Sequence, residues 1–264
     1  IVDAAAAALG GRDRLVQLDG LVIRGNGVAP LAGQNRMPND ELPVWKVSEY
    51  TRTTDLSQRR TRVRQTREAQ FLFAGETVQR QTQGLDGNVA YNVGADGAVT
   101  RTADAAARDR RIELLHHPIT VVRAALAPGA TLGNLRSDAG VQLVDVTTAD
   151  GDMVTLGIDS STHLPMRVMS MADNPNMGDV AIVTTFADYE DVGGLKLPRR
   201  LTTKIDKYVQ FDLQVSKNAV DGDAADLAIA DAVKSAPAPT PPAVVVTAES
   251  MGKGIWWLAG SGNH

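Results

Sequence analysis

Residues 209–216 read Val-Gln-Phe-Asp-Leu-Gln-Val-Ser, the most regular run of the chain. Its apolar members, Val209, Phe211, Leu213 and Val215, alternate with polar ones, which places them on one face of a strand. A strand with one apolar and one polar face is typical of an antiparallel sheet that buries a single face. We therefore expect these four side chains to belong to a buried sheet surface.

The same pattern extends back to Val141. Six strand-like runs follow one another, separated by turn signals such as Asp150-Gly151 and Gly193-Gly194. The connections are too short for parallel crossovers, so an antiparallel meander is predicted. The six runs are Gln142–Thr148, Met153–Ile158, Leu164–Met171, Val180–Tyr189, Leu197–Ile205 and Tyr208–Ser216.

The first half of the chain alternates between helix and strand signals. The run Ala103–Ala127 has apolar residues at helical spacing and is divided by Pro118, which predicts two helices that cover the apolar face of the sheet. The other expectations are a helix over Val2–Leu9, a strand at Leu21–Ile23, a long loop over Gly25–Pro43, two strands over Val44–Glu68, a hairpin around Leu85–Gly87 and a short helix over Ala224–Lys234.

Composition narrows the function classes. Among 264 residues, 43% are hydrophobic and there is no cysteine, so a real core is possible while disulfides, thiolate zinc sites and a cysteine nucleophile are excluded. The net charge of -4 gives no global attraction to nucleic acid or to anionic membranes. No apolar run approaches the ~20 residues of a membrane span.

The run Arg59–Arg67 is rich in cations and raises a nucleic-acid interpretation. The overall acidity and the lack of interleaved aromatic residues favour the alternative, in which these arginines line the solvent face of a β-ribbon beside acidic residues. The acidic residues expected there are Asp40, Glu41, Glu49 and Asp55.

His116 and His117 are the first candidates for chemistry. Adjacent residues on a helix point about 100° apart, so the pair is poorly placed to bind one metal ion. His163 and His264 are the other imidazoles of the chain. We favour helix capping or packing for the pair and assign no catalytic residue and no metal ligand.

The composition changes after residue 220. Residues 1–220 are expected to form the sheet domain, 221–243 a helix and a Pro-rich linker, and 244–264 the start of a second, incomplete domain. Trp256 and Trp257 lie in this last part. They are either ordinary core residues or a docking surface for a partner domain.

Several motifs resemble the lipoprotein-carrier-like (LolA/LppX-type) sheet domain of exported bacterial proteins. They are Leu9-Gly10-Gly11, Asp159-x-x-Thr162-His-Leu164-Pro165 and the run from Phe186 to Pro198, followed by the strand that ends at Ser216. The resemblance covers about residues 1–220. It implies an α+β fold, a strongly curved antiparallel half-barrel with helices packed on or plugging its concave face, with Val209, Phe211, Leu213 and Val215 on that face.

The tail from Ala248 to His264 resembles the opening hairpin of metallo-β-lactamase-fold hydrolases. The His-x-His-x-Asp-His metal motif of that family is absent from this sequence, so no ligand is carried over and no cofactor is expected in this chain. The resemblance implies zinc only for a catalytic domain beyond His264. The first residue, Ile1, is likewise expected to follow a removed signal peptide or a cut.

Three hypotheses follow. The first is a non-catalytic amino-terminal accessory domain of an exported, periplasmic or secreted hydrolase, docked to the hydrolase domain or a second subunit through Trp256 and Trp257. The second is a module that binds a lipid or lipoprotein acyl chain on its concave face. The third is a structural or assembly domain.

Overall fold

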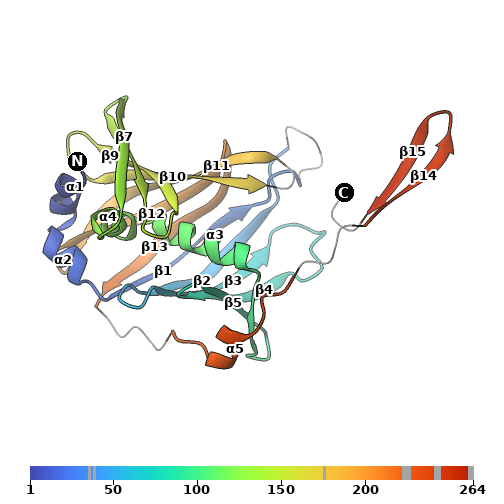
Figure 1. Cartoon of the computed structure of the whole chain (residues 1–264), viewed down its shortest axis with the longest axis horizontal. Helices are drawn as coiled ribbons and strands as arrows, with labels where there is room; N and C mark the ends of the chain where they lie inside the picture. The colour runs from blue at the N-terminus through green and yellow to red at the C-terminus, as the bar shows by residue number, and fades with distance from the viewer. Residues whose placement is uncertain (35–36, 38–39, 175–176, 222–226, 241–244, 261–264) are drawn as a thin grey trace.

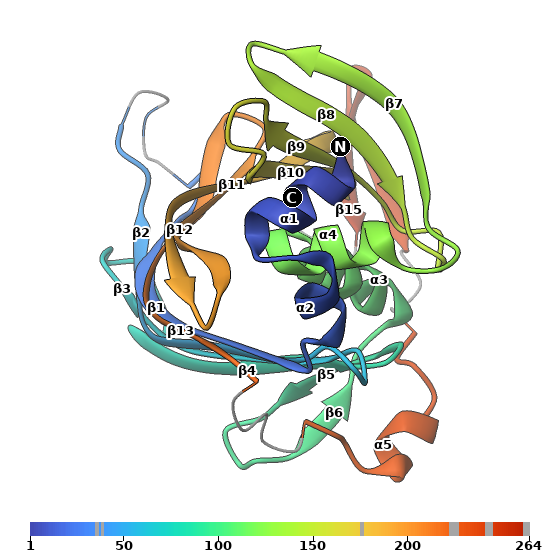
Figure 2. The same ribbon diagram turned by 90° about the vertical axis from the view of Figure 1, so that its left-hand side faces the viewer.

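The computed structural model describes residues 1–34, 37, 40–174, 177–221, 227–240 and 245–260. Within these ranges one large antiparallel sheet of 13 strands dominates the chain. It curves strongly around a group of helices without closing into a barrel (Figures 1 and 2). The strand order is β6-β5-β4-β3-β2-β1-β13-β12-β11-β10-β9-β8-β7, so two meanders meet where β1 pairs with β13.

The first meander comes before the central helices and the second follows them. The first consists of β1 (Gly20–Pro30), β2 (Val44–Asp55), β3 (Arg60–Ala69), β4 (Val78–Asp86), β5 (Val89–Val93) and β6 (Val99–Arg101). The second consists of β7 (Thr131–Asp138), β8 (Val141–Thr147), β9 (Met153–Asp159), β10 (Pro165–Asn174), β11 (Gly178–Val192), β12 (Leu195–Ile205) and β13 (Tyr208–Val220).

Four helices lie inside the curve of the sheet (Figure 2). They are α1 (Val2–Leu9), α2 (Arg12–Gln17), α3 (Asp104–Leu115) and α4 (Pro118–Leu126). A fifth, α5 (Asp231–Ser235), packs beside β6, and a separate hairpin is formed by β14 (Val246–Gly252) and β15 (Ile255–Gly260). No helix in the described ranges is long and apolar enough to cross a membrane.

One core unites the helices with the inner face of the sheet. It contains Leu9 of α1, Ile119 of α4 and Leu156 of β9, all without exposed surface. Leu213 and Val215 of β13 belong to the same core. The expected curved antiparallel sheet, with helices over its apolar face, is therefore confirmed, and the sheet is open rather than a closed barrel.

The sequence interpretation was wrong over residues 25–30. Gly25 and Gly27 were assigned to a loop, but both belong to β1. A Cβ atom at Gly25 would lie 2.2 Å from the Gln214 carbonyl oxygen, and one at Gly27 would lie 2.1 Å from the Asp212 carbonyl oxygen. These glycines allow the backbones of β1 and β13 to approach closely at register shifts, which is a known use of glycine within strands.

Two further differences concern elements at the margins. The strand β7 was not predicted. All of its residues are exposed, so its sequence lacks the alternation of apolar and polar residues by which a half-buried strand is recognised. The helix expected over Ala224–Lys234 is confined to α5 in the described part of that range, while residues 224–226 lie outside the described residues.

Replacing Gly25 by alanine tests the register between β1 and β13. Gly25→Ala is expected to lower the free energy of unfolding by about 1–3 kcal/mol, because the new methyl group collides with backbone. The matched control is Gly75→Ala, where nothing lies within 4 Å of the added Cβ. Chemical denaturation that finds both variants equally stable would contradict the register.

Candidate functional site

The predicted concave residues differ in their depth. Leu213 and Val215 are buried in the core, Phe211 packs against it half-buried, and Val209 is also half-buried. A register shift lies between Thr203, which pairs with Phe211, and Lys204, which pairs with Val209. Val209 therefore shares the outer face with exposed Lys204, and the expectation that it lies on the concave face is wrong. The concave face is therefore filled near the helices and becomes more exposed toward the amino-terminal end of β13.

Aromatic side chains lie along the half of the concave face that is farther from α1. Tyr50 packs on Phe211 with ring centroids 5.5 Å apart. Trp45 meets Phe71 edge-on at 5.1 Å, and Phe71 contacts Phe73 at 4.6 Å. Phe73 remains 59% exposed. We call Trp45, Tyr50, Phe71 and Phe211 the aromatic wall.

A polar surface faces the same interior from β3 and β4. Val47 of β2 lies in the core and is paired with Arg67, which is paired in turn with Gln79, so all three share the concave face. Gln65 is paired with Gln81 on the same face. We call the set Gln65, Arg67, Gln79, Gln81 and Gln83 the polar strip.

Side-chain hydrogen bonds tie the polar strip together. Arg67 Nε donates to Gln79 Oε1 at 2.7 Å, and Gln65 Nε2 donates to Gln81 Oε1 at 3.0 Å. The Arg67 guanidinium lies 4.5 Å from the centroid of the Trp45 ring, a cation–π contact that joins strip and wall. The concave face therefore has an apolar side and a cationic, amide-rich side.

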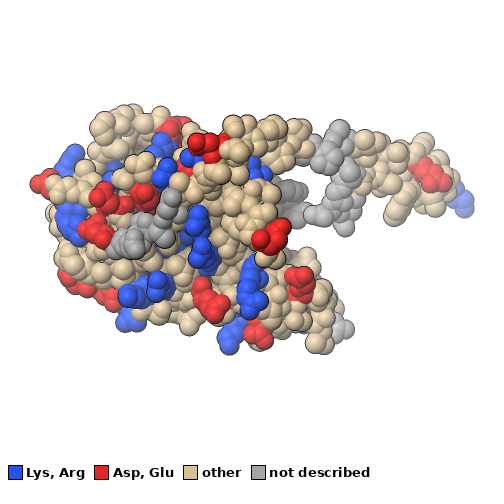
Figure 3. All heavy atoms as spheres, turned by 90° about the horizontal axis from the view of Figure 1, so that it is seen from below, with Lys and Arg blue, Asp and Glu red and all other residues tan. Residues whose placement is uncertain are grey.

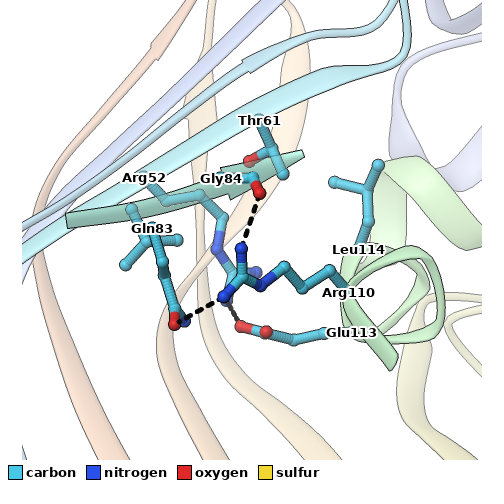
Figure 4. Close-up of a pocket in the computed structure, with 8 residues that line it drawn as sticks. Arg52, Thr61, Gln83, Gly84, Arg110, Glu113 and Leu114 are labelled. Atoms are coloured by element: carbon cyan, nitrogen blue, oxygen red, sulfur yellow. Dashed lines mark hydrogen bonds and ion pairs between the residues drawn. The ribbon is translucent and has the colours of Figure 1, made fainter. Parts of the chain in front are cut away.

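The polar strip ends at a cluster of charged groups under α3 (Figure 4). Arg52 Nη2 contacts Glu113 Oε1 at 2.8 Å. Arg110 reaches from α3 to the sheet, where it donates to the carbonyl oxygens of Gly84 at 2.7 Å and Tyr91 at 2.5 Å. These groups line a cavity of about 10 Å³, enough for about one water molecule.

His116 and His117 have structural roles at the junction of α3 and α4. The two ring nitrogens of His116 each lie 2.9 Å from a hydroxyl, those of Thr184 and Ser170. His117 Nδ1 accepts from the Ile119 N–H and so caps α4. Burial first, and the charge of Arg52 second, lower the pKa of His116 to about 4 and that of His117 to about 3.

The other expected positions lie elsewhere. His163 is exposed in the turn between β9 and β10, and His264 lies outside the described residues. The expectation that the Arg59–Arg67 side chains line a solvent face is wrong for Arg60, which pairs with buried Asp86 at 2.8 Å, and for Arg67. Among the described residues no group of three or more His, Cys, Asp or Glu is placed to hold a metal ion.

Trp256 and Trp257 lie on the β14–β15 hairpin, which stands apart from the sheet in Figure 1. They are 60% and 63% exposed, and Ile255 and Leu258 beside them are similarly exposed. Trp256 is paired with Ser250 and Trp257 with Glu249, so the two indoles point to opposite faces. The hairpin surface carries few charges (Figure 3).

Sequence reasoning missed the polar strip. Val63 is the single apolar residue of the arginine-rich run Arg59–Arg67, and it lies in the core. Strand alternation from Val63 places Gln65 and Arg67 on the inward face. That signal was available from the sequence, whereas the cross-strand partners of Arg67 depend on the pairing register.

Comparisons with known proteins find only distant structural similarities. No protein-family model matches the sequence, and no curated protein matches it. The chain is similar to a LolA superfamily protein from Nitrosomonas europaea, with 11% identity and a TM-score of 0.46 over 81% of this chain and 92% of that one.

Two other solved structures are similar at 11% identity. A DUF1329 family protein from Desulfovibrio piger gives a TM-score of 0.43 over 88% of this chain and 94% of that one. LprF from Mycobacterium bovis gives 0.28 over 83% and 92%. None of these similarities assigns a ligand to this chain, and nothing in them supports a metallo-β-lactamase-fold parent protein.

The buried imidazoles predict a pH dependence of stability. Because both histidines have a lowered pKa in the folded chain and an ordinary one near 6.5 when unfolded, their stabilisation is complete above about pH 6.5 and is lost as the pH falls. Between about pH 6.5 and 5 the free energy of unfolding should fall by up to ~1.4 kcal/mol per pH unit for each histidine.

His116→Gln should reduce that slope by roughly half. His163→Asn is the control, because His163 is exposed and asparagine tolerates its positive φ of 60°. Denaturation curves at several pH values measure the slopes. A slope that His116→Gln leaves unchanged would exclude the buried, neutral state of this imidazole.

Proposed function

We propose that this chain is a non-catalytic binding module that holds a hydrophobic molecule, such as a lipid or an acyl chain, on the concave face of its sheet. The observation that carries the proposal is Phe211. It faces the inside of the curve on β13 and contacts Tyr50, yet it stays half-exposed, as does Ile205 on the inward face of β12. An inward apolar surface that the chain's own helices leave partly uncovered is suited to a ligand.

In this proposal the ligand lies near the aromatic wall rather than beneath the helices. Around α1 and α4 the core is filled, with Leu9, Ile119 and Val121 fully buried. The cavity beneath α3 has room for about one water molecule. An acyl chain would therefore lie along Trp45, Tyr50 and Phe211.

The proposal makes no use of the histidines as catalysts, since His116 and His117 serve the α3–α4 junction. It keeps the exported location, periplasmic or extracellular, that the carrier-like motifs imply. The domain boundaries at residues 220 and 243 also belong to the proposal.

Uptake of a fluorescent fatty acid tests this function. Phe211→Ser should weaken binding by about tenfold, because it removes a large apolar contact from the wall. Gln210→Ser, on the neighbouring exposed position of the same strand, should leave the affinity unchanged. A protein that takes up no probe, or equal affinities for both variants, would overturn the proposal.

A second candidate function rests on the β14–β15 hairpin. Large apolar side chains exposed on both faces of a two-stranded hairpin are costly in water and are typical of a surface that another domain or subunit covers. Trp256 and Trp257 would then dock this chain to a carboxy-terminal domain, a hydrolase domain in the metallo-β-lactamase resemblance, or to a second subunit.

Sedimentation velocity tests the second-subunit form of this candidate. The native chain should self-associate with increasing concentration, and Trp256→Ser/Trp257→Ser should remain monomeric, because the double change removes the two largest exposed apolar side chains of the hairpin. Val78→Ser, an exposed apolar position on β4, is the control. A native chain that stays monomeric at all concentrations would reject docking between copies.

A further inference from the structure

The polar strip gives the concave face a second chemical character. Opposite the apolar residues of β13, the inward positions of β3 and β4 carry four glutamines and an arginine. Successive inward positions are about 6.7 Å apart along a strand, so the strip from Gln79 to Gln83 runs for about 13 Å. The amide and guanidinium groups of this surface match polar atoms of a ligand rather than apolar ones.

Arg67 is the key residue of this surface. Its contacts are neutral: Nε donates to the Gln79 side chain, and the guanidinium lies over the Trp45 ring. Among the described residues no carboxylate forms an ion pair with it. Burial lowers the pKa of Arg67.

Arg110 likewise has neutral partners at the inner end of the strip. It donates to two backbone carbonyl oxygens and to the side-chain oxygens of Gln83, at 3.4 Å, and Asn92, at 2.7 Å. Glu113, the carboxylate of this cluster, forms an ion pair with Arg52 (Figure 4). Among the described residues neither Arg67 nor Arg110 forms an ion pair, so this part of the concave face has an excess of positive charge.

The position of Arg67 matches the polar end of an amphiphile. Arg67 lies at the same end of β3 as the β3–β4 connection that carries Phe71 and Phe73, and it touches the aromatic wall through Trp45. A molecule whose apolar tail followed Tyr50 and Phe211 would bring its head group to this arginine. A guanidinium offers five N–H donors and binds a carboxylate or phosphate in bidentate fashion. Among the described residues only the Nε of Arg67 has a hydrogen-bond partner, Gln79 Oε1.

We propose that the hydrophobic molecule bound by this chain is an anionic amphiphile, whose carboxylate or phosphate head group is bound by Arg67 at the outer end of the polar strip while its tail lies on the aromatic wall. This inference rests on the proposed function and specifies its ligand. The amide groups of Gln65, Gln79 and Gln81 supply neutral hydrogen-bond donors beside the anion. Arg110 adds positive charge from the inner end.

Competition against a neutral fluorescent probe, N-phenyl-1-naphthylamine, tests the inference on the full chain. The competitors share one twelve-carbon tail and differ in the head group: dodecanoate, dodecyl phosphate and the neutral monododecanoylglycerol. The anionic competitors should displace the probe at concentrations about tenfold lower than the neutral one. Inorganic phosphate alone should not displace it.

Arg67→Gln should abolish this anionic preference while the affinity for the neutral probe is kept. Arg67→Lys should retain part of the preference, because the charge remains while the bidentate geometry is lost. The matched control is Arg64→Gln, an exposed arginine on the opposite face of β3 that changes the net charge equally. A thermal melt establishes that each variant is folded.

The outcomes separate the two proposals. If the probe binds and all three competitors displace it equally, or if Arg64→Gln loses the preference as Arg67→Gln does, the inference is overturned and the proposed function stands. If the probe does not bind at all, the proposed function fails and the inference fails with it. A preference for dodecyl phosphate over dodecanoate identifies the ligand as a phosphate ester, and the opposite preference identifies it as a fatty acid. Displacement of the probe by inorganic phosphate contradicts the proposal that the ligand is an amphiphile.

Discussion

The curl of the thirteen-stranded sheet creates an apolar inner face that other elements must cover. Twist accumulates from strand to strand, and strongly twisted sheets of this width rarely remain open without curling, splitting or flattening. Here α1, α2 and α4 cover the inner face over much of its extent, with Leu9, Leu15 and Ile119 withdrawn from solvent. In the remaining part of the concave face Trp45 and Tyr50 of the aromatic wall are buried, whereas Phe71 and Phe211 stay partly exposed, and this incomplete cover is the feature on which the functional proposal depends.

Polar groups brought inside with the helices all require partners, and the structure shows how several are satisfied. Arg123 of α4 donates to the carbonyl oxygens of Leu15 and Leu18, which satisfies the carboxyl end of α2 and joins the two helices. His116 bonds two strands through Ser170 and Thr184. The helices are therefore attached to the sheet and to each other by specific hydrogen bonds as well as by apolar contact.

The sequence predicted much of the second meander because its signal is local. Alternation in Val209–Ser216 and the Asp-Gly turns require no knowledge of the partner strands. Gly25 and Gly27 read as a loop because their role depends on the backbone of β13, almost two hundred residues away. For the same reason the partners of Arg67 in β4, and its contact with Trp45 in β2, appear only with the register.

The site shows the same division between local and long-range information. Local alternation groups Val209 with Phe211, Leu213 and Val215, whereas the register shift on β13 turns Val209 to the outer face and leaves Phe211 half-exposed. The exposure of Trp256 and Trp257 on a separate hairpin could not be derived from the run that contains them, since an apolar pair reads alike in a core and on a docking surface. The concave face and the hairpin are thus two distinct apolar surfaces.

Quenching of tryptophan fluorescence by a brominated fatty acid distinguishes these two surfaces most directly, because bromine quenches only on contact and the chain has three tryptophans. In the Trp256→Phe/Trp257→Phe variant the fluorescence comes from Trp45 alone, which lies on the aromatic wall. The account predicts saturable quenching of Trp45 in this variant. Quenching that disappears from this variant, and persists in Trp45→Phe, would place the ligand on the hairpin and contradict a binding site on the concave face.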